Sequence, residues 1–303
     1  MMQILTPSTP ARLDLDKIEL QVARCPSLPS LNSINKALQE LLAVEQRYSA
    51  QISEVIRRDP SLTARLLRLV NSVYYGLSNP VNSVEEAVFY LGMRQIRQLT
   101  MVTPIIEDFQ KLTRQCSFPW REFWQHSIGA AILTREVFTA VSTPTDESDY
   151  VAGLVHDVGK IVMAWSFPDH FTEIHRQALD GKRDLGEIEN EVLGIDHSEL
   201  GAIYLERHRL PELMIKSARF HHHPEKAGPH APIIASVQIA DLLLRKETIG
   251  CSGNYQTVTH EQCLAASGWT VLLTDVTDAE QAIAKASLHR SLERLPNVLE
   301  GLV

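Results

Sequence analysis

The chain has 303 residues, of which 44% are hydrophobic and 22% are charged, so it can bury a substantial core. Its 37 acidic and 29 basic residues give a formal net charge of -8, which disfavours nucleic-acid binding because that function requires a basic surface. The cysteines are scattered with no CxxC pair, so we expect reduced thiols in a cytoplasmic protein. There is no basic-then-apolar leader and no run of about 18 apolar residues, so we expect no membrane partner.

The first half of the chain is predicted to be helical. Residues 1–17 hold two prolines among polar neighbours and are expected to form a loose lead-in, which overlaps the start of a helix predicted over 15–23. Asp59-Pro60-Ser61 is a strong helix start, because Asp caps and Pro suits the first helical position, and this helix is expected to end at Gly76. Ser83 opens a further helix through the capping-box pattern SVEE. No period-two pattern appears here, so we predict an all-α fold.

The second half of the chain is also predicted to be helical, and its helices have more apolar faces. A bulky apolar stripe over 118–138 predicts a long helix, and YVAGLVHDVGK predicts a buried helix over 150–160. An irregular helix is expected to follow, broken near Pro168. Two more are predicted over 211–223 and 231–245, and shorter amphipathic helices are expected after residue 246.

Several metal-ligand residue types lie in or beside these apolar patterns. His156 and Asp157 are adjacent in YVAGLVHDVGK, and similar positions are held by His126, His197, His221, His222 and Asp241. Burying so many titratable groups is costly unless something pairs with them, and one metal ion would pair with several. Imidazole nitrogens and carboxylate oxygens are ligands that Zn, Mn and Fe accept. The pattern therefore predicts a metal centre.

Simpler interpretations stay open for individual residues. Asp241 is also placed for an i, i+4 salt bridge with Arg245, and His197 suits a helix end. His223 is expected to face solvent. Asn71 and Ser72 are interpreted as helix termination and packing, with a partner surface as the alternative.

The order His, His-Asp, His, His-His, Asp resembles the HD superfamily of metal-dependent phosphohydrolases, most closely its HD-GYP branch and the related HDOD domain. The stretch RRDPSLTARLLRLVNSVYYGLSNPVNSVEEAVFYLGMRQIRQL is similar to the first half of HDOD domains, in which DPxLxxxLLxLxNSxxYG and SxxxAxxxLG recur. This resemblance covers about 20–245. It implies an N-terminal helical subdomain over 18–115, packed with an HD-type helical bundle over 116–245, and leaves 246–303 as a C-terminal helical extension.

The resemblance also implies roles for the site residues. One divalent ion would be held by His126, His156, Asp157 and Asp241. A second would be held by His197, His221 and His222, with Asp157 bridging both ions. Glu122, one turn before His126, matches the ligand of a third ion in some HD-GYP members, or it is a solvated helix residue. Lys160 matches a lysine that faces a substrate phosphate, with a surface lysine as the alternative. Two ions are expected, with iron or manganese favoured over zinc.

Two functions follow from these resemblances. HDOD domains are regarded as signalling output modules, which implies a regulatory protein with a partner bound through the N-terminal half. The ligand set implies the alternative, a metal-dependent phosphohydrolase acting on a nucleotide or cyclic dinucleotide, with Asp157 and Lys160 as catalytic residues. The segment HHHPEKAGPHAP lacks the Arg, the Gly-rich turn and the Gly-Tyr-Pro of the HD-GYP motif. Their absence argues against hydrolysis of cyclic di-GMP.

Overall fold

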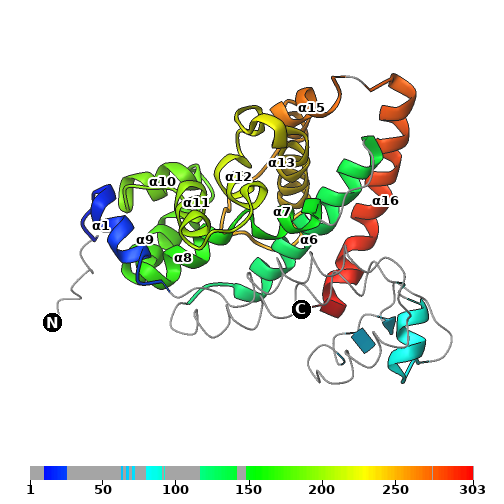
Figure 1. The fold of residues 1–303 in the computed structure, drawn as a ribbon, viewed down its shortest axis with the longest axis horizontal. Coiled ribbons are helices and arrows are strands. Elements are labelled where there is room, and N and C mark those ends of the chain that lie inside the picture. The colour runs from blue at the N-terminus through cyan, green and yellow to red at the C-terminus, as the bar shows by residue number, and fades with distance from the viewer. Residues whose placement is uncertain are drawn as a thin grey trace.

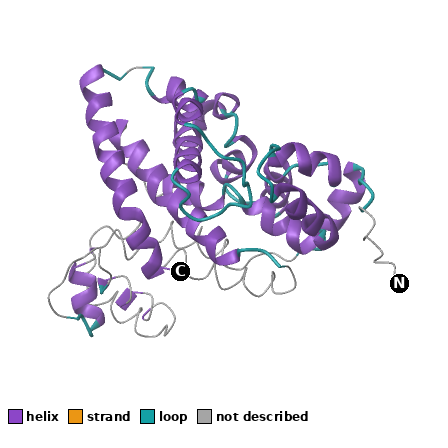
Figure 2. Ribbon diagram, turned by 180° about the vertical axis from the view of Figure 1, so that it is seen from behind, coloured by secondary structure: helices purple, strands orange, loops and turns teal. Residues whose placement is uncertain are grey.

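A computed structural model of the chain describes residues 10–25, 63, 66–67, 70–71, 80–90, 92, 117–141, 148–274 and 276–302. Every regular element in those ranges is a helix, which confirms the predicted all-α fold (Figures 1 and 2). The predicted helix start at Asp59–Ser61 and the stop at Gly76 lie outside the described residues and stay predictions.

Helix α1 spans Leu15–Val22, close to its predicted bounds. It begins where the Asp14 side chain accepts a hydrogen bond from the backbone N–H of Lys17. Leu13, in the predicted loose lead-in, donates its N–H to the Leu193 carbonyl at 2.9 Å. The end of the lead-in is therefore held against the second half of the chain.

Two described pieces of the first half agree with their predicted local structure. The Ser83 hydroxyl accepts from the Glu86 N–H at 3.1 Å, and residues 84–90 are helical behind this cap. The Asn71 side chain accepts from the Val81 N–H at 2.7 Å and donates to the Val81 carbonyl at 2.8 Å. These bonds support the packing interpretation of Asn71, because they tie a helix end to the next segment.

Helix α6 is central to the second half. It spans Trp120–Val141 and packs against α7 (Ser148–Val155), α13 (Ala231–Lys246) and α16 (Asp278–Leu302). Figure 1 shows α16 lying beside α6. Because neighbours cover α6 on several sides, it is apolar around most of its circumference, as a buried helix must be.

The remaining helices complete the second half. They are α8 (Val158–Ser166), α9 (Pro168–Ala178), α10 (Leu185–Val192), α11 (His197–Arg207), α12 (Glu212–Phe220), α14 (His260–Leu264) and α15 (Ser267–Leu272), with 3₁₀ turns over Pro224–Lys226 and Gly228–His230. The predicted break near Pro168 is present, because this proline starts α9 and has no N–H to continue α8. Helix α10, which starts at the capping side chain of Asp184, was not predicted from the sequence.

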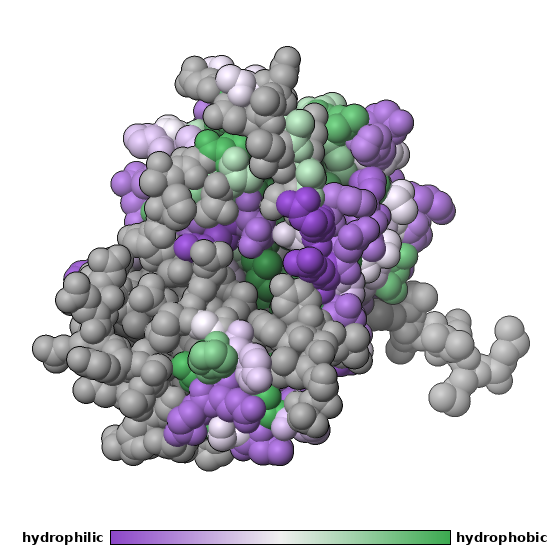
Figure 3. All heavy atoms as spheres, turned by 90° about the vertical axis from the view of Figure 1, so that its right-hand side faces the viewer, coloured by the Kyte–Doolittle hydropathy of each residue, from purple (hydrophilic) through white to green (hydrophobic). Residues whose placement is uncertain are grey.

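The described surface is mainly polar with scattered apolar residues. Figure 3 shows hydrophilic side chains beside smaller hydrophobic areas on one face. Large exposed apolar side chains include Leu20, Phe89 and Leu264. None of the described helices combines the length and the apolar character needed to cross a bilayer.

Candidate metal centre

His156 and Asp157 lie at the junction of two helices. Helix α7 ends at Val155 and α8 begins at Val158, so the predicted single helix over 150–160 is broken at the histidine-aspartate pair. Asp157 has φ -97° and ψ 13°, outside regular helix geometry. This break lets adjacent side chains face the same region, since residues in one straight helix would point about 100° apart.

The first group of candidate ligands comes from α6, this junction and α13. The ligand atoms of His126, His156 and Asp157 all lie within 4.8 Å of one another, and all three side chains are buried. Asp241 on α13 adds a carboxylate oxygen 3.0 Å from His126 Nε2. That approach lacks hydrogen-bond geometry, and a metal ion held by both residues would satisfy the two groups.

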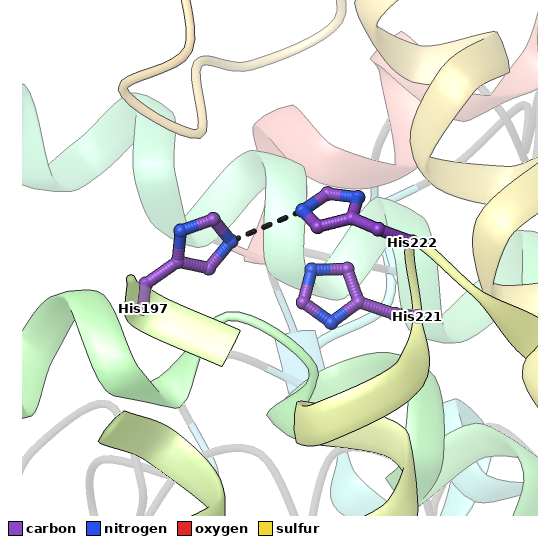
Figure 4. Close-up of side chains that lie close together, drawn as sticks. All are labelled: His197, His221 and His222. Atoms are coloured by element: carbon purple, nitrogen blue, oxygen red, sulfur yellow. Dashed lines mark hydrogen bonds between the residues drawn. The ribbon is translucent and has the colours of Figure 1, made fainter. Parts of the chain in front are cut away.

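The second group comes from α11 and the turn after α12. His197, His221 and His222 bring ring nitrogens within 4.8 Å of one another, and His222 is the partly exposed member. Figure 4 shows the three rings gathered around one point, with His197 Nε2 and His222 Nε2 3.2 Å apart. Asp157 Oδ1 lies 3.4 Å from His197 Nε2 and 3.8 Å from His221 Nε2, so Asp157 stands between the groups.

Hydrogen bonds at Nδ1 orient three of the imidazoles. His156 Nδ1 lies 2.7 Å from the Gly153 carbonyl, and His221 Nδ1 lies 2.8 Å from the Ala218 carbonyl. His197 Nδ1 lies 2.6 Å from a carboxylate oxygen of Glu189. A neutral imidazole that donates from Nδ1 keeps the Nε2 lone pair for a metal.

Several of these Nε2 atoms have close carboxylates but no hydrogen bond in the described part of the chain. Nε2 of His126, His156 and His221 is buried there without a hydrogen-bond partner. Buried nitrogens of this kind are costly unless a ligand satisfies them. The residues present therefore fit a divalent metal.

The ionisation states of His126, His221 and Asp157 also suit metal ligands. Burial lowers the pKa of His221 to about 3, and burial also lowers the pKa of His126. For His156, burial is the largest single influence and lowers the pKa, but the charge and contact of Asp157 together with the charge of Asp241 outweigh it, so the net pKa is raised. Burial opposes ionisation of Asp157, yet Lys160 and His156 outweigh it and hold the pKa of Asp157 well below its usual range. The carboxylate is thus charged, as metal binding requires.

Lys160 lies inside the centre. Its Nζ donates to Asp157 Oδ2 at 2.7 Å, and the side chain is buried, so the surface-lysine alternative does not apply. Glu122 differs, because it is exposed in the first turn of α6 and belongs to neither group of three. A third-ion role for Glu122 stays a prediction.

Two residues show both the simpler role that the sequence allowed and the position of a candidate ligand. Asp241 Oδ2 lies 3.6 Å from Arg245, so the predicted salt bridge exists while Oδ1 of the same carboxylate faces His126. His197 does occupy a helix end, as the first residue of α11, and it also joins the second group. His223 is exposed, as predicted.

Glu189 was not among the site residues predicted from the sequence. Its carboxylate is buried and accepts from both the backbone N–H of His197 at 2.8 Å and the ring Nδ1. The available signal was its position among buried Leu185, Ile188 and Val192 on one face of α10, where an unpaired carboxylate would be costly.

A cavity of about 660 Å³ adjoins the second group. His197 and His222 form part of its wall, together with Arg219, Lys226 and Arg245. Arg219 is held by carboxylates, since it donates to Glu199 at 2.8 Å and to Glu206 at 2.7 Å. The cavity therefore joins candidate metal ligands to side chains of both charges, because Asp184, Glu187, Asp196 and Glu199 also line it.

The chain is similar to several known proteins. A Treponema pallidum protein of uncharacterised function is 27% identical over 230 residues, which are 73% of this chain but only 42% of that protein. An HDOD domain protein of unknown function from Geobacter sulfurreducens has the same fold, with a TM-score of 0.77, 23% identity and coverage of 96% of this chain and 99% of that one. A candidate phosphohydrolase from Shewanella amazonensis SB2B has a TM-score of 0.66 and 22% identity, covering 94% and 98% of the two chains.

The family model that matches is that of the HDOD domain. The match runs over residues 28–224 and thus includes both groups of candidate ligands except Asp241. Since it covers more than half of the sequence, this chain belongs to the HDOD domain family.

Proposed function

We propose that this protein is a signalling module of the HDOD family that binds two divalent metal ions on either side of Asp157. The observation that carries the proposal is the position of this carboxylate. Its Oδ2 lies 3.4 Å from His156 Nε2, and its Oδ1 lies 3.4 Å from His197 Nε2. A carboxylate with one oxygen toward each group of imidazoles is placed to bridge two ions.

The ligands divide between the two ions. The first ion would be held by His126, His156, Asp157 and Asp241, and the second by Asp157, His197, His221 and His222. Imidazole and carboxylate donors suit iron, manganese and zinc, and no cysteine in the described ranges joins either group. We favour iron or manganese.

We place the signalling partner on the N-terminal helical half. Phe89 in the helix over 84–90 is 82% exposed, and its ring packs edge-on against Tyr90. Exposed aromatic side chains are enriched at protein interfaces, so this pair supports a protein partner there. The metal centre lies in the other half, so the two functions would occupy different surfaces.

A second candidate function is hydrolysis of a phosphoester, on a nucleotide or a cyclic dinucleotide. The cavity beside His197 and His222 favours it, because a substrate would reach the second group there. Two divalent ions would neutralise phosphoryl charge and activate water. Lys226 and Arg245 line the same cavity and would hold the anionic substrate in position. Lys160 would keep Asp157 ionised through their 2.7 Å contact.

Metal analysis of protein purified without chelator tests the proposed centre. We expect about two equivalents of divalent metal, as a bridged pair requires, and their loss in Asp157→Asn. His223→Ala is the matched control, because His223 is exposed and adjacent to the proposed ligands. Less than about a tenth of an equivalent in the wild type, even after adding iron or manganese, would contradict the proposal.

Measured rates of phosphodiester hydrolysis distinguish the two proposed functions. The metal-loaded wild type and Asp157→Asn would be compared on bis(p-nitrophenyl) phosphate, a generic phosphodiester, and then on cyclic dinucleotides. Hydrolysis that disappears in the folded variant supports the enzyme. Two bound ions with no turnover above the variant's level support the signalling module.

A further inference from the structure

We infer that a backbone contact between Gly159 on α8 and Gly201 on α11 positions His197 against Asp157 and thereby determines binding of the second ion. This inference rests on the proposed two-ion centre. It assigns a positioning role to Gly201, a residue outside the candidate ligand set. The contact joins α8, whose N-cap is Asp157, to α11, whose first residue is His197.

Neither glycine has room for a side chain. A Cβ on Gly159 would lie 1.8 Å from the His197 carbonyl oxygen and 2.7 Å from the Gly201 nitrogen. A Cβ on Gly201 would lie 3.0 Å from the Gly159 nitrogen and 3.2 Å from its Cα. The nearest atoms are backbone atoms, and the one side-chain atom beside them is a Val158 methyl carbon 3.2 Å from a Cβ on Gly201.

Packing is the reason for both glycines, because their backbone conformations do not require them. Positive φ angles occur at other glycines, such as Gly194, but not at Gly159 or Gly201. Glycine is the poorest helix former except proline, so it weakens a helix that gains nothing from it. Here each glycine lets α8 and α11 approach until their backbones touch.

The contact acts directly on proposed ligands. Gly159 follows Asp157 by two residues, and the atom that it touches is the carbonyl of His197 itself. The His197 ring cannot easily compensate for a displaced backbone, because Glu189 accepts from both its N–H and its Nδ1. A shift of a few tenths of an ångström at this contact would exceed the tolerance of about 0.2 Å for metal–ligand distances.

This shift should change the affinity for the first ion much less. His126 lies on α6 and Asp241 on α13, and α13 is among the closest neighbours of α6. Displacement of α11 leaves that packing in place. We therefore expect a change at this contact to weaken binding of the second ion and to leave binding of the first ion largely intact.

Gly201→Ala is the test variant, since its new methyl requires a small displacement rather than a gross clash. Manganese would be titrated into metal-free protein by calorimetry and followed by electron paramagnetic resonance. We expect the second ion to bind at least about tenfold more weakly while the first is retained, with the coupled two-ion signal replaced by that of an isolated ion. This pattern should match His197→Gln, whereas His126→Gln should lose the other ion.

Gly268→Ala is the control for simple loss of stability. A Cβ on Gly268 would also meet a backbone atom, the Ala235 carbonyl oxygen at 2.8 Å, but neither residue belongs to the centre. This variant should keep both ions. If Gly201→Ala does not fold, Val158→Ala/Gly201→Ala replaces it, because the added change removes the Val158 methyl that lies 3.2 Å from the new Cβ.

Two results would overturn the inference. One is a folded Gly201→Ala variant that binds both ions as tightly as the wild type. The other is equal weakening of both ions, which would mean general destabilisation. A wild type that binds no metal is a different result, because it defeats the proposed function itself.

Discussion

At the scale of single residues, the candidate centre depends on side chains that would not touch a metal. His156 and His221 are oriented by backbone carbonyls, but His197 is oriented by the carboxylate of Glu189. A carboxylate partner holds the proton on Nδ1 and makes Nε2 a stronger donor to a metal. Glu189 is therefore the residue whose replacement should separate orientation from ligation.

Glu189→Gln should weaken the second ion without removing a ligand. The amide is nearly the same size but loses the negative charge opposite Nδ1, so we expect a decrease in affinity of about 10- to 100-fold. Manganese titration measures the change. Glu187→Gln, an exposed position on the same helix, should bind manganese like the wild type. Equal affinity in Glu189→Gln and the wild type would exclude a contribution of the Glu189 charge to metal binding.

At the scale of elements, the ends of helices place the ligands. His156 and Asp157 lie between α7 and α8, His197 begins α11, and His221 follows the last residue of α12. Helix ends have unsatisfied backbone groups, and their caps determine where the helix begins. The Asp196 side chain caps α11 by accepting from the Glu199 N–H at 2.9 Å.

Asp196→Ala should lower stability and metal affinity together. Loss of the cap costs about 1 kcal/mol, and fraying at the start of α11 would loosen His197. Asp184→Ala removes the corresponding cap of α10, where Asp184 accepts from the Glu187 N–H at 3.1 Å. It should cost a similar free energy but leave metal content nearly unchanged. Urea unfolding and metal analysis of both variants check this, and parallel metal loss would contradict it.

At the scale of the whole molecule, the centre concentrates titratable groups in the core. Buried carboxylates and imidazoles from α6, the α7–α8 junction, α11, the turn after α12 and α13 meet there, with Lys160 and Arg245 as cations. Their pKa values differ between the folded and unfolded states, so the stability of the metal-free protein must depend on pH.

The sign of this dependence can be stated for His221. Its pKa is lowered from 6.5 in the unfolded chain to about 3 in the folded protein by burial. As pH falls through this interval, His221 is protonated in the unfolded state but stays neutral in the folded state. The free energy of unfolding therefore decreases by at most about 1.4 kcal/mol per pH unit. Urea unfolding of chelator-treated protein between pH 7 and pH 4 should show a shallower slope for His221→Gln, and unchanged slopes would refute the assignment.

The sequence by itself determined the all-α fold and most of the helices. Helical periodicity, the cap at Ser83 and the break at Pro168 are local properties, so a local pattern records them. The residue types also indicated a metal centre, because several histidines and aspartates would otherwise be buried at high cost.

Only the tertiary structure decided how those residues are grouped. The gap between α7 and α8, the position of Asp157 between two groups, the partner of Lys160 and the role of Glu189 all depend on packing among helices far apart in the sequence. The exposure of Glu122 likewise depends on which neighbours cover α6. Periodicity specifies which face of a helix is buried, but the distance between two side chains on different helices depends on how closely the helices approach. At Gly159 and Gly201, that approach is limited by the backbones themselves.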